Sequence, residues 1–516
     1  MANQTLFASL RDALIPKTNT VNSENAPAYA LAPKQALAQY AATGCFGRTF
    51  YSNASEQLTR VLELCNSVDP KFVAQVAVYS RSQALMKDMP ALLCAWLSVA
   101  EPMLHQAVFA RVIDSTRMLR NYVQILRSGV VGRKSLGTAP KRLVSEWLAS
   151  RDAEELFRSS VGQNPSFADV LKMVHPKPAG KEREAFYGYM LGRPHDANAL
   201  PKLVLQFEQF KAGETLQVPN LPFTMLSPML SQEDWVSVAK NASWQTTRMN
   251  LNTFARHGVF EAQRMAELIA DRLRDTVEIR RARVFPYQLL TAYQNCDAAV
   301  PRVVRDALQD AMETAIGNVP SIDGDVVVCP DVSGSMSSPV TGHRAGSTTS
   351  VRCIDAAALV AAAVLRKNQS ATVLPFEETV VAVNLDSRDN VMTNAGRLAA
   401  IGGGGTNCSA PLRLSNQRKA KADLVVFISD NESWVDRRHG RETALLAEWS
   451  AFRQRNPKAR LVCVDIQPNQ TTQAAEREDI LNIGGFSDQV FDVIGAFAAG
   501  QLEADHWIAR IEAVVI

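Results

Sequence analysis

Apolar and polar residues recur with a helical period through most of the first 320 residues. Between about residues 27 and 318, apolar positions return every three or four residues, in segments separated by short Pro, Gly or Asn breaks. Such amphipathic segments predict helices at residues 54–68, 70–83, 91–102, 106–129, 139–152 and 300–318. Successive helices of this length bury their apolar faces on one another. The pattern therefore predicts an all-α helical-repeat domain over residues 28–320, after an N-terminal segment of residues 1–27.

The pattern changes after residue 320, where short apolar runs alternate with helical stretches. Strands are expected at residues 325–331, 371–377, 423–430, 460–466 and 489–493, and helices between them at residues 351–368 and 441–456. Strands that alternate with helices predict a parallel sheet covered on both faces. We therefore expect an α/β doubly wound domain over residues 321–516, with any ligand at the carboxyl ends of its strands.

Oxygen-bearing side chains stand at the places where such a ligand would bind. Asp331, Ser333 and Ser335 follow the first strand in DVSGS, Thr406 lies in the turn GGGGTNC, and Asp430 follows the strand LVVFIS. An isolated DxSxS is equally well explained as a Ser/Gly turn. The five oxygen donors together match the preference of hard cations, so they predict a site for one divalent cation, Mg²⁺ first and Mn²⁺ as the alternative.

Positive charge is concentrated in one stretch of a chain whose net charge is only +3. Residues 115–145 contain no acidic residue and seven basic ones, Arg117, Arg120, Arg127, Arg133, Lys134, Lys141 and Arg142. A solvated helix face is the alternative, but such faces usually mix the two signs of charge. The stretch therefore favours contact with RNA phosphates.

A second RNA-binding candidate lies in VHPKPAGK (174–181), where His175 stands near Lys177. An imidazole can stack on a base or donate to a phosphate, although a lone histidine is more often structural.

The cysteines and the apolar runs bear on location. Eight cysteines are scattered without CxxC pairs, which is typical of reduced thiols in a cytoplasmic protein. No stretch of eighteen uncharged apolar residues occurs, and charges interrupt the N-terminal segment. We therefore expect a cytoplasmic protein that neither is secreted nor spans a membrane.

Several segments resemble a known family in order and spacing. GGGGTNCSAPL (402–412) and SDNESW (429–434) resemble the C-terminal half of the Ro60/Rsr ribonucleoproteins, and the five metal-site positions match the metal-ion-dependent adhesion site (MIDAS) of von Willebrand factor A domains. Residues 126–148, 167–178 and 281–293 resemble the TROVE module of the same family. The resemblance covers roughly residues 28–516, with Asn407 as a departure, because an acidic residue often follows the metal-site threonine.

This resemblance implies a ring of HEAT-like repeats. Such a ring would bind Y-like RNA on its outer basic surface and admit single-stranded ends of misfolded RNA into its central hole. Bacterial members of the family are implicated in RNA quality control with an exoribonuclease. The resemblance further implies a bacterial Ro ribonucleoprotein.

No catalytic motif points to an enzyme. The chain has no GxxxxGK[ST] loop, and Ser333 has no evident histidine partner. We expect a non-enzymatic protein that binds noncoding RNA and no DNA. One alternative is a metal-dependent protein-interaction scaffold, in which an acidic side chain of a partner completes the metal shell. A metal-dependent nuclease is less favoured, because two-metal sites need more carboxylates.

Overall fold

The structure is a computed structural model of the 516-residue chain. It describes residues 16–43, 51–161, 165–282, 284–342, 351–435, 442–467, 469–486, 490–501 and 506–516. As far as they are described, residues 1–59, 243–252 and 266–509 form one compact unit, here called the sheet unit. Residues 60–242, 253–265 and 510–516 form the other, the helical unit. Because the two units interleave along the chain, they do not test the boundaries at residues 27 and 320, which stay a prediction.

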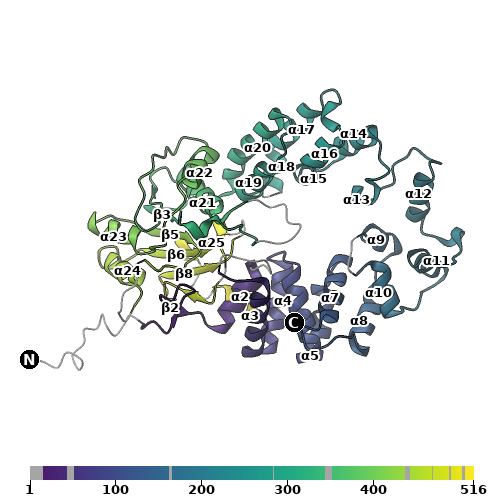
Figure 1. Cartoon of the computed structure of the whole chain (residues 1–516), viewed down its shortest axis with the longest axis horizontal. Helices are drawn as coiled ribbons and strands as arrows, with labels where there is room; N and C mark the ends of the chain where they lie inside the picture. Colours follow the sequence, from purple (N-terminus) through teal and green to yellow (C-terminus); the bar gives the residue numbers. More distant parts are fainter. Residues whose placement is uncertain are drawn as a thin grey trace, which may run out of the picture. The chain divides into compact units, whose positions relative to one another are not determined.

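The helical unit is built from short amphipathic helices joined by turns (Figure 1). After α3 (Ala54–Ser67), which begins before residue 60, its helices up to residue 242 are α4 (Pro70–Ser82), α5 (Asp88–Ala100), α6 (Pro102–Val112), α7 (Thr116–Ser128), α8 (Thr138–Ala149), α9 (Ala153–Arg158), α10 (Phe167–Val174), α11 (Lys181–Met190), α12 (Lys202–Lys211), α13 (Phe223–Leu226) and α14 (Gln232–Asn241). Helix α7 illustrates the pattern, because Leu119, Tyr122 and Leu126 are buried on one face while Arg117 and Arg127 are exposed on the other.

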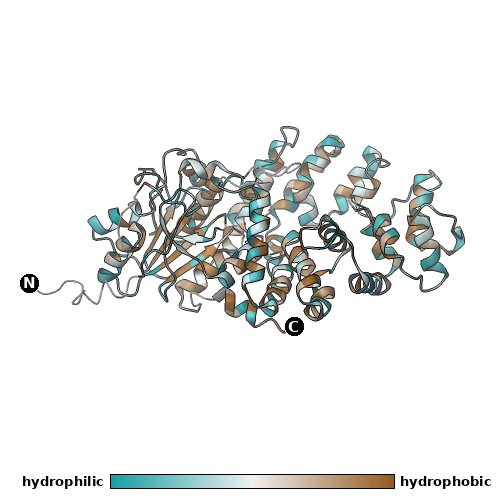
Figure 2. Ribbon diagram, turned by 60° about the horizontal axis from the view of Figure 1, so that its bottom comes forward, coloured by the Kyte–Doolittle hydropathy of each residue, from teal (hydrophilic) through white to brown (hydrophobic). Residues whose placement is uncertain are grey.

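More helices follow before residue 320. They are α15 (Trp244–Met249), α16 (Leu251–Arg256), α17 (Met265–Arg274), α18 (Thr276–Arg281), α19 (Pro286–Gln294) and α20 (Arg302–Ala315). Figure 2 shows that the helices carry apolar and polar residues on different faces, whereas the strands of the sheet are mainly apolar. In the part of the chain that the structure describes, no helix is long and apolar enough to cross a membrane.

The sheet unit contains a parallel sheet whose described strands lie in the order β4-β3-β5-β6-β8. Their bounds are β3 (Val326–Pro330), β4 (Thr372–Val373), β5 (Leu424–Ser429), β6 (Arg460–Asp465) and β8 (Ile480–Gly484). The helices after β3 are α21 (Cys353–Lys367), α22 (Val391–Ala399), α23 (Ala410–Gln417), α24 (Ala444–Arg455), α25 (Val490–Ala498) and α26 (His506–Glu512). Every residue of β3 and β5 is buried, as expected for central strands with helices on both faces. The predicted doubly wound fold is confirmed.

Residues near the N-terminus extend this sheet unit. Strand β1 (Thr20–Val21) pairs with β2 (Pro27–Ala30), which pairs in turn with β7 (Thr471–Thr472). Tyr29 belongs to the same buried cluster as Trp449 and Phe427. Helix α2 (Pro33–Thr43) then packs against β8, with the Gln39 side chain over the backbone of Gly484. The first described residues are therefore part of the hydrophobic core around the sheet.

Two predicted elements are wrong. Residues 490–493, predicted as a strand together with Gln489, lie in helix α25, and the last strand of the sheet is β8 instead; Gln489 itself lies outside the described residues. The apolar positions Val490, Ile494 and Phe497 follow a helical period that a five-residue window could not reveal. The single helix predicted at 106–129 is two helices, α6 and α7, because the Ser115 hydroxyl caps α7 by accepting from Met118 N.

Candidate functional site

Asp331 is fixed at the carboxyl end of β3 by its neighbours. Its N–H donates to Ile428 O at 2.9 Å, and its carboxylate accepts from Ser333 N at 2.8 Å and from Ser429 Oγ at 2.6 Å. The side chain is fully buried. Burial, and then the nearby Asp430, raise the pKa of Asp331 to about 7. Two carboxylates held this close destabilise the fold at neutral pH unless a positive charge joins them.

The glycine-rich turn brings Thr406 to the same place. Gly404 has φ +67°, a conformation that favours glycine, and its carbonyl accepts from Gly334 N at 3.1 Å. This contact ties the turn to the DVSGS loop. Thr406 Oγ1 donates to Ser333 Oγ at 3.0 Å, and Ser333 Oγ lies 3.4 Å from Ser335 Oγ. Three hydroxyl groups therefore meet beside Asp331.

Asp430 contributes the second carboxylate. Its Oδ1 accepts from Glu432 N at 3.4 Å. Its Oδ2 is buried and has no hydrogen-bond partner among the described residues. Burial raises the pKa of Asp430. An unpartnered buried carboxylate oxygen is costly, and a cation is the partner that would satisfy it.

The five predicted donors thus lie together, at the carboxyl ends of β3 and β5 and in the turn before α23. Two carboxylates and three hydroxyls, without nitrogen or sulfur, are the donor chemistry that suits Mg²⁺ or Mn²⁺. No group of three His, Cys, Asp or Glu side chains suited to a metal occurs among the described residues, so the hydroxyls are essential to this donor set. Asn407 takes no part, because its amide donates to Glu378 O at 2.8 Å and accepts from Ser409 Oγ at 2.9 Å.

Three residues around these donors were not predicted. Ser429 and Glu432 lie within two residues of Asp430, so their closeness in the sequence could have indicated a place in this site. Nothing in the sequence around Tyr51 indicates such a place. Burial, and then the nearby Asp430, raise the pKa of Tyr51. Glu432 accepts from Ser23 N at 2.7 Å and Ser23 Oγ at 3.2 Å; burial, and then Asp430, raise its pKa to about 7.

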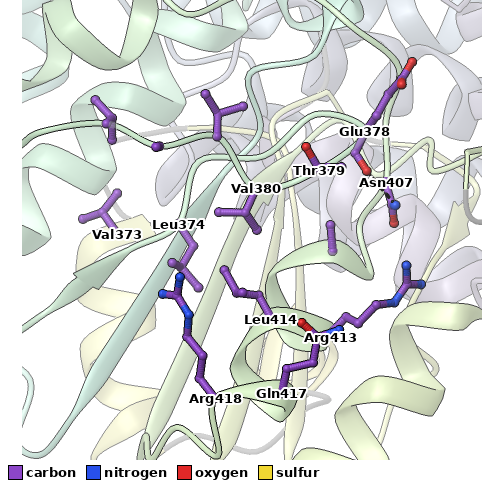
Figure 3. Close-up of a pocket in the computed structure, with 14 residues that line it drawn as sticks. Val373, Leu374, Glu378, Thr379, Val380, Asn407, Arg413, Leu414, Gln417 and Arg418 are labelled. Atoms are coloured by element: carbon purple, nitrogen blue, oxygen red, sulfur yellow. Dashed lines mark hydrogen bonds between the residues drawn. The ribbon is translucent and has the colours of Figure 1, made fainter.

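A cavity of about 500 Å³ lies beside β4, at the edge of the sheet (Figure 3). Its lining is mainly apolar, with Leu374, Val380 and Leu414 in the interior and the guanidinium groups of Arg413 and Arg418 nearby. Arg413 is 3.5 Å from the Glu448 carboxylate. None of the five metal-site donors lines this cavity, so it is separate from the metal site.

Most of the predicted basic residues of the helical unit are accessible. Exposed side chains from this set are Arg117, Arg127, Lys134, Lys141, Arg142 and Lys177. Among the described residues, only Arg142 of these six forms a salt bridge, at 3.7 Å to Glu146, and it also donates to Gln106. Arg133 is half-buried and donates to Ser98 O at 3.4 Å. Apart from Arg142, the exposed members form no salt bridge with a described acidic residue, and they leave a field of positive charge on α7, α8 and the turns nearby.

Arg120 differs from the other six basic residues between 115 and 145. It is buried, and its guanidinium donates to Val161 O at 2.7 Å and Ser160 O at 3.4 Å. Burial, and then the charge of Arg117, lower its pKa. Arg120 therefore joins α7 to the segment after α9 and presents no charge to an RNA.

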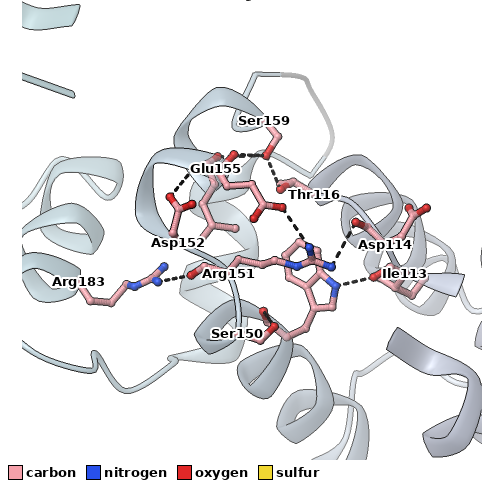
Figure 4. A network of polar contacts seen from close by, with 11 residues as sticks. Ile113, Asp114, Thr116, Ser150, Arg151, Asp152, Glu155, Ser159 and Arg183 are labelled. Atoms are coloured by element: carbon pink, nitrogen blue, oxygen red, sulfur yellow. Dashed lines mark hydrogen bonds and ion pairs between the residues drawn. The ribbon is translucent and has the colours of Figure 1, made fainter. Parts of the chain in front are cut away.

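Other arginines of the helical unit are also structural (Figure 4). Arg151 lies 5.0 Å from the ring centre of Trp147 and donates to Glu155 Oε1 at 3.2 Å, while Arg183 donates to the Arg151 carbonyl. Asp152 caps α9 by accepting from Glu155 N at 2.8 Å. These arginines interact with nearby acidic, aromatic and carbonyl groups, unlike most of the exposed cations on α7 and α8.

His175 ends α10 in a left-handed conformation, with φ +53°. Its ring is exposed and lines a cavity of about 320 Å³ together with Lys172, Tyr187 and Arg193. Lys177 is exposed but is not part of this lining. An imidazole, an aromatic ring and two cations around one cavity suit a nucleotide, which offers a base and a phosphate.

Fold and site together define a class of protein. A parallel sheet with DxSxS after its first strand, a threonine turn and an aspartate after a neighbouring strand is a von Willebrand factor A-type domain. Here it follows a helical region. Residues 326–498 match the model of the Ro60 vWA domain family. This part of the chain is a vWA domain that is similar to the Ro60 vWA domain family.

The likeness extends over nearly the whole chain. It is 24% identical to the RNA-binding protein RO60 of Deinococcus radiodurans, over 92% of this chain and 94% of that protein. It is 23% identical to the RNA-binding protein RO60 of Caenorhabditis elegans, over 55% of this chain and 44% of that one. The crystal structure of the D. radiodurans RO (RSR) protein superposes with a TM-score of 0.63 at 21% identity, covering 91% of this chain and all of that one. The predicted relationship to the Ro60 family is confirmed.

Proposed function

We propose that this chain binds noncoding RNA without hydrolysing it, through a basic surface in the helical unit. The basic surface consists of Arg117, Arg127, Lys134, Lys141 and Lys177, with His175 beside it. The observation that carries the proposal is that these five cations are exposed and form no salt bridge with another described residue. Phosphates that replace condensed counterions on such a surface gain binding free energy that depends steeply on salt.

The relatives support this proposal, because two of them are named RNA-binding proteins. The proposed ligand is a structured, Y-like RNA on the basic surface, with single-stranded ends entering a ring of HEAT-like repeats. The proposed role is cytoplasmic RNA quality control or processing, in which a partner exoribonuclease does the cleavage. Exposed cations select phosphates and shape rather than sequence, which suits a protein that handles misfolded RNA of many sequences.

One divalent cation, Mg²⁺ first and Mn²⁺ as the alternative, is proposed for the metal site. Asp331, Ser333, Ser335, Thr406 and Asp430 would hold it, and Ser429 would orient the Asp331 carboxylate. The bound cation would supply a fixed positive charge that neutralises the two buried carboxylates and can bind an acidic side chain of a partner protein. The role proposed for this site is binding, because its donors would hold one cation and a two-metal nuclease site needs more carboxylates.

The test is a salt titration of RNA affinity with two variants that each remove four positive charges. One changes part of the basic surface, Arg117, Arg127, Lys134 and Lys141, to Gln. The matched control changes exposed lysines elsewhere, Lys71, Lys202, Lys421 and Lys458, to Gln. The probe is a transcribed stem-loop RNA with a single-stranded 3′ end.

We expect the first variant to reduce the slope of log affinity against log salt by about 3, because each lost phosphate contact removes about 0.7–0.9. The control should keep the slope of the unmodified chain. Equal slopes for the two variants would mean that the RNA does not bind at the basic surface. Cleavage of the probe by the purified chain would contradict the non-enzymatic proposal. A chain that binds no RNA and that retains a partner protein only when Mg²⁺ is present would favour the interaction scaffold.

A further inference from the structure

A second group of basic residues lies on the sheet unit, in and after two neighbouring helices. Helices α23 and α24 pack against each other, and the turns that follow them lead into β5 and β6. Residues 413–422 and 449–464 contain no acidic residue. They contain eight basic ones, which are Arg413, Arg418, Lys419, Lys421, Arg453, Arg455, Lys458 and Arg460.

Hydrogen bonds join the two basic segments to each other. Asn456 Nδ2, in the turn after α24, donates to Ala420 O, in the turn after α23, at 3.2 Å. Arg455 donates to Asn416 Oδ1, and its guanidinium lies 5.9 Å from the ring centre of Phe452. The two turns therefore lie side by side, and their basic residues belong to one surface.

Only some of these cations are used by the fold. Three of the eight interact with other groups: Arg413 with Glu448, Arg453 with Asp479, and Arg460 with the Phe497 carbonyl. Asp423, the acidic residue that follows Lys421, accepts from Asp325 N at 2.9 Å. The other five cations are exposed and form no salt bridge with a described acidic residue; they are here called the edge patch and consist of Arg418, Lys419, Lys421, Arg455 and Lys458.

The cavity of about 500 Å³ beside β4 adjoins the edge patch. Arg418, at the carboxyl end of α23, belongs to the patch and also lines the cavity, where its side chain extends toward Leu374 (Figure 3). Val380 and Leu414 contribute further apolar surface, and the exposed Glu378 is the acidic residue in the described lining. A cavity of this volume is large enough for a ligand. Apolar surface and free positive charge therefore meet at Arg418.

The combination indicates which kind of partner fits. The phosphates of an RNA could bind the cations, but an RNA has no aliphatic side chain to fill the cavity, and no aromatic ring that could stack on a base belongs to the described lining. A polypeptide can carry carboxylates and a large apolar side chain in the same short segment. Such a segment would satisfy both parts of the surface at once.

We propose that the edge patch and the adjoining cavity form a docking site for a segment of a partner protein that combines acidic residues with a large apolar side chain. The apolar side chain would enter the cavity beside Leu374 and Leu414, and the carboxylates would lie over the edge patch. None of the five metal-site donors lines the cavity, so this docking needs no bound cation. It is also separate from the RNA-binding surface proposed on α7 and α8.

The test begins with a random peptide library displayed on phage, selected against the immobilised full chain. Selection is carried out in EDTA, so that no peptide can bind through a divalent cation. The most enriched peptide is then synthesised with a fluorescent label, and its affinity for the full chain and for the variants is measured by fluorescence anisotropy. Circular dichroism checks that each variant is folded.

The variants separate the cations from the cavity. Ala382→Trp fills the cavity from an exposed position in its lining. If this variant has lower thermal stability, Gln417→Trp, which fills the cavity from the exposed end of α23, is measured in its place. The charge variant changes Lys419, Lys421 and Lys458 to Gln, and its matched control changes the exposed Lys71, Lys181 and Lys202 to Gln.

We expect the enriched peptides to contain acidic residues together with a large apolar one. The charge variant should bind the peptide about tenfold more weakly, and the matched control within about twofold of the unmodified chain. The variant with a filled cavity should also lose about tenfold, because the apolar side chain of the peptide stays in water.

Several results would overturn the proposal. They are the absence of an enriched peptide, enriched peptides without acidic residues, equal peptide affinity in the charge variant and its control, and full affinity in the variant with a filled cavity. The charge variant should bind RNA as the matched control does. If it binds RNA more weakly than the control, the edge patch is an RNA-binding surface and the proposal is wrong.

Discussion

Asp331→Asn separates the charge of the metal-site carboxylate from its shape. Asn keeps the size of the side chain, its Oδ1 can still accept from Ser333 N, and its amide can donate to Ser429 Oγ, whose hydroxyl is free to rotate. What the substitution removes is a fully buried negative charge next to Asp430. The metal-free chain should therefore gain stability at neutral pH, although the variant loses a proposed metal ligand.

The pH range follows from the pKa of Asp331, which is raised from 3.8 to about 7. A group whose pKa is raised by folding contributes stability that is fully present below its unfolded pKa and is lost as pH rises through the folded pKa. The metal-free chain should thus lose stability between about pH 4 and pH 7. At 1.36 kcal/mol per pKa unit, the ionised carboxylate costs about 4 kcal/mol near pH 8. Asn avoids that cost, so we expect a gain of about 2–4 kcal/mol there and little gain near pH 4.

The assay is denaturant unfolding of the full chain in EDTA across this pH range, and the transition that is analysed is the unfolding of the sheet unit. The same series is then repeated with Mg²⁺. The unmodified chain should be stabilised by Mg²⁺ more strongly at high pH, where the carboxylates are ionised, and Asp331→Asn should not respond to Mg²⁺. A variant that is less stable than the unmodified chain by the same amount at both ends of the pH range would refute the reasoning. It would mean that the carboxylate stabilises the fold by its hydrogen bonds, with no net cost from its buried charge.

Further outcomes follow from other residues. Burial, and then Arg133, lower the pKa of His105 from 6.5 to about 4. The stability that its neutral ring contributes is therefore present above about pH 6.5 and is lost as pH falls through 4. His105→Gln should remove about 3 kcal/mol of this pH dependence in acid unfolding curves, and an unchanged curve would contradict this prediction. Arg120→Met should lower the free energy of unfolding by about 1–3 kcal/mol without changing the salt slope of RNA binding. Lys134→Gln should do the reverse, lowering the slope by about 0.7–0.9 with stability unchanged within about 0.5 kcal/mol; equal behaviour of these two variants would contradict the distinction. Gly404→Ala should cost on the order of 1–2 kcal/mol, because φ is +67° there, and full stability in a melting experiment would show that the turn relaxes.

The metal-site donors could be predicted from sequence because each stands in a short motif at a strand end or a glycine turn. Parallel strands place their carboxyl ends at one edge, so Asp331 and Asp430 had to lie near each other once their strands were recognised. Tyr51 could not be predicted, because nothing in its local sequence records which distant loop it meets. The same holds for β2, whose pairing partner β7 lies more than four hundred residues further along the chain.

The basic residues show a different limit. Residues 115–145 reveal their charge in the sequence, but the side on which each side chain lies depends on the buried face of its helix. In α7 that face contains Leu119, Val123 and Leu126, and Arg120 lies next to it, three residues before Val123. Its hydrogen bonds to Ser160 and Val161 depend on tertiary packing. Charge composition therefore predicted the basic surface but not the exclusion of Arg120.

Ultraviolet cross-linking of the full chain to its RNA, followed by mass spectrometry of the cross-linked peptides, tests the central claim most directly. The account predicts structured noncoding RNA in the purified complex and cross-links concentrated in residues 116–149 and around His175, weakened by high salt. No copurifying RNA, or cross-links confined to residues outside those two stretches, would contradict it.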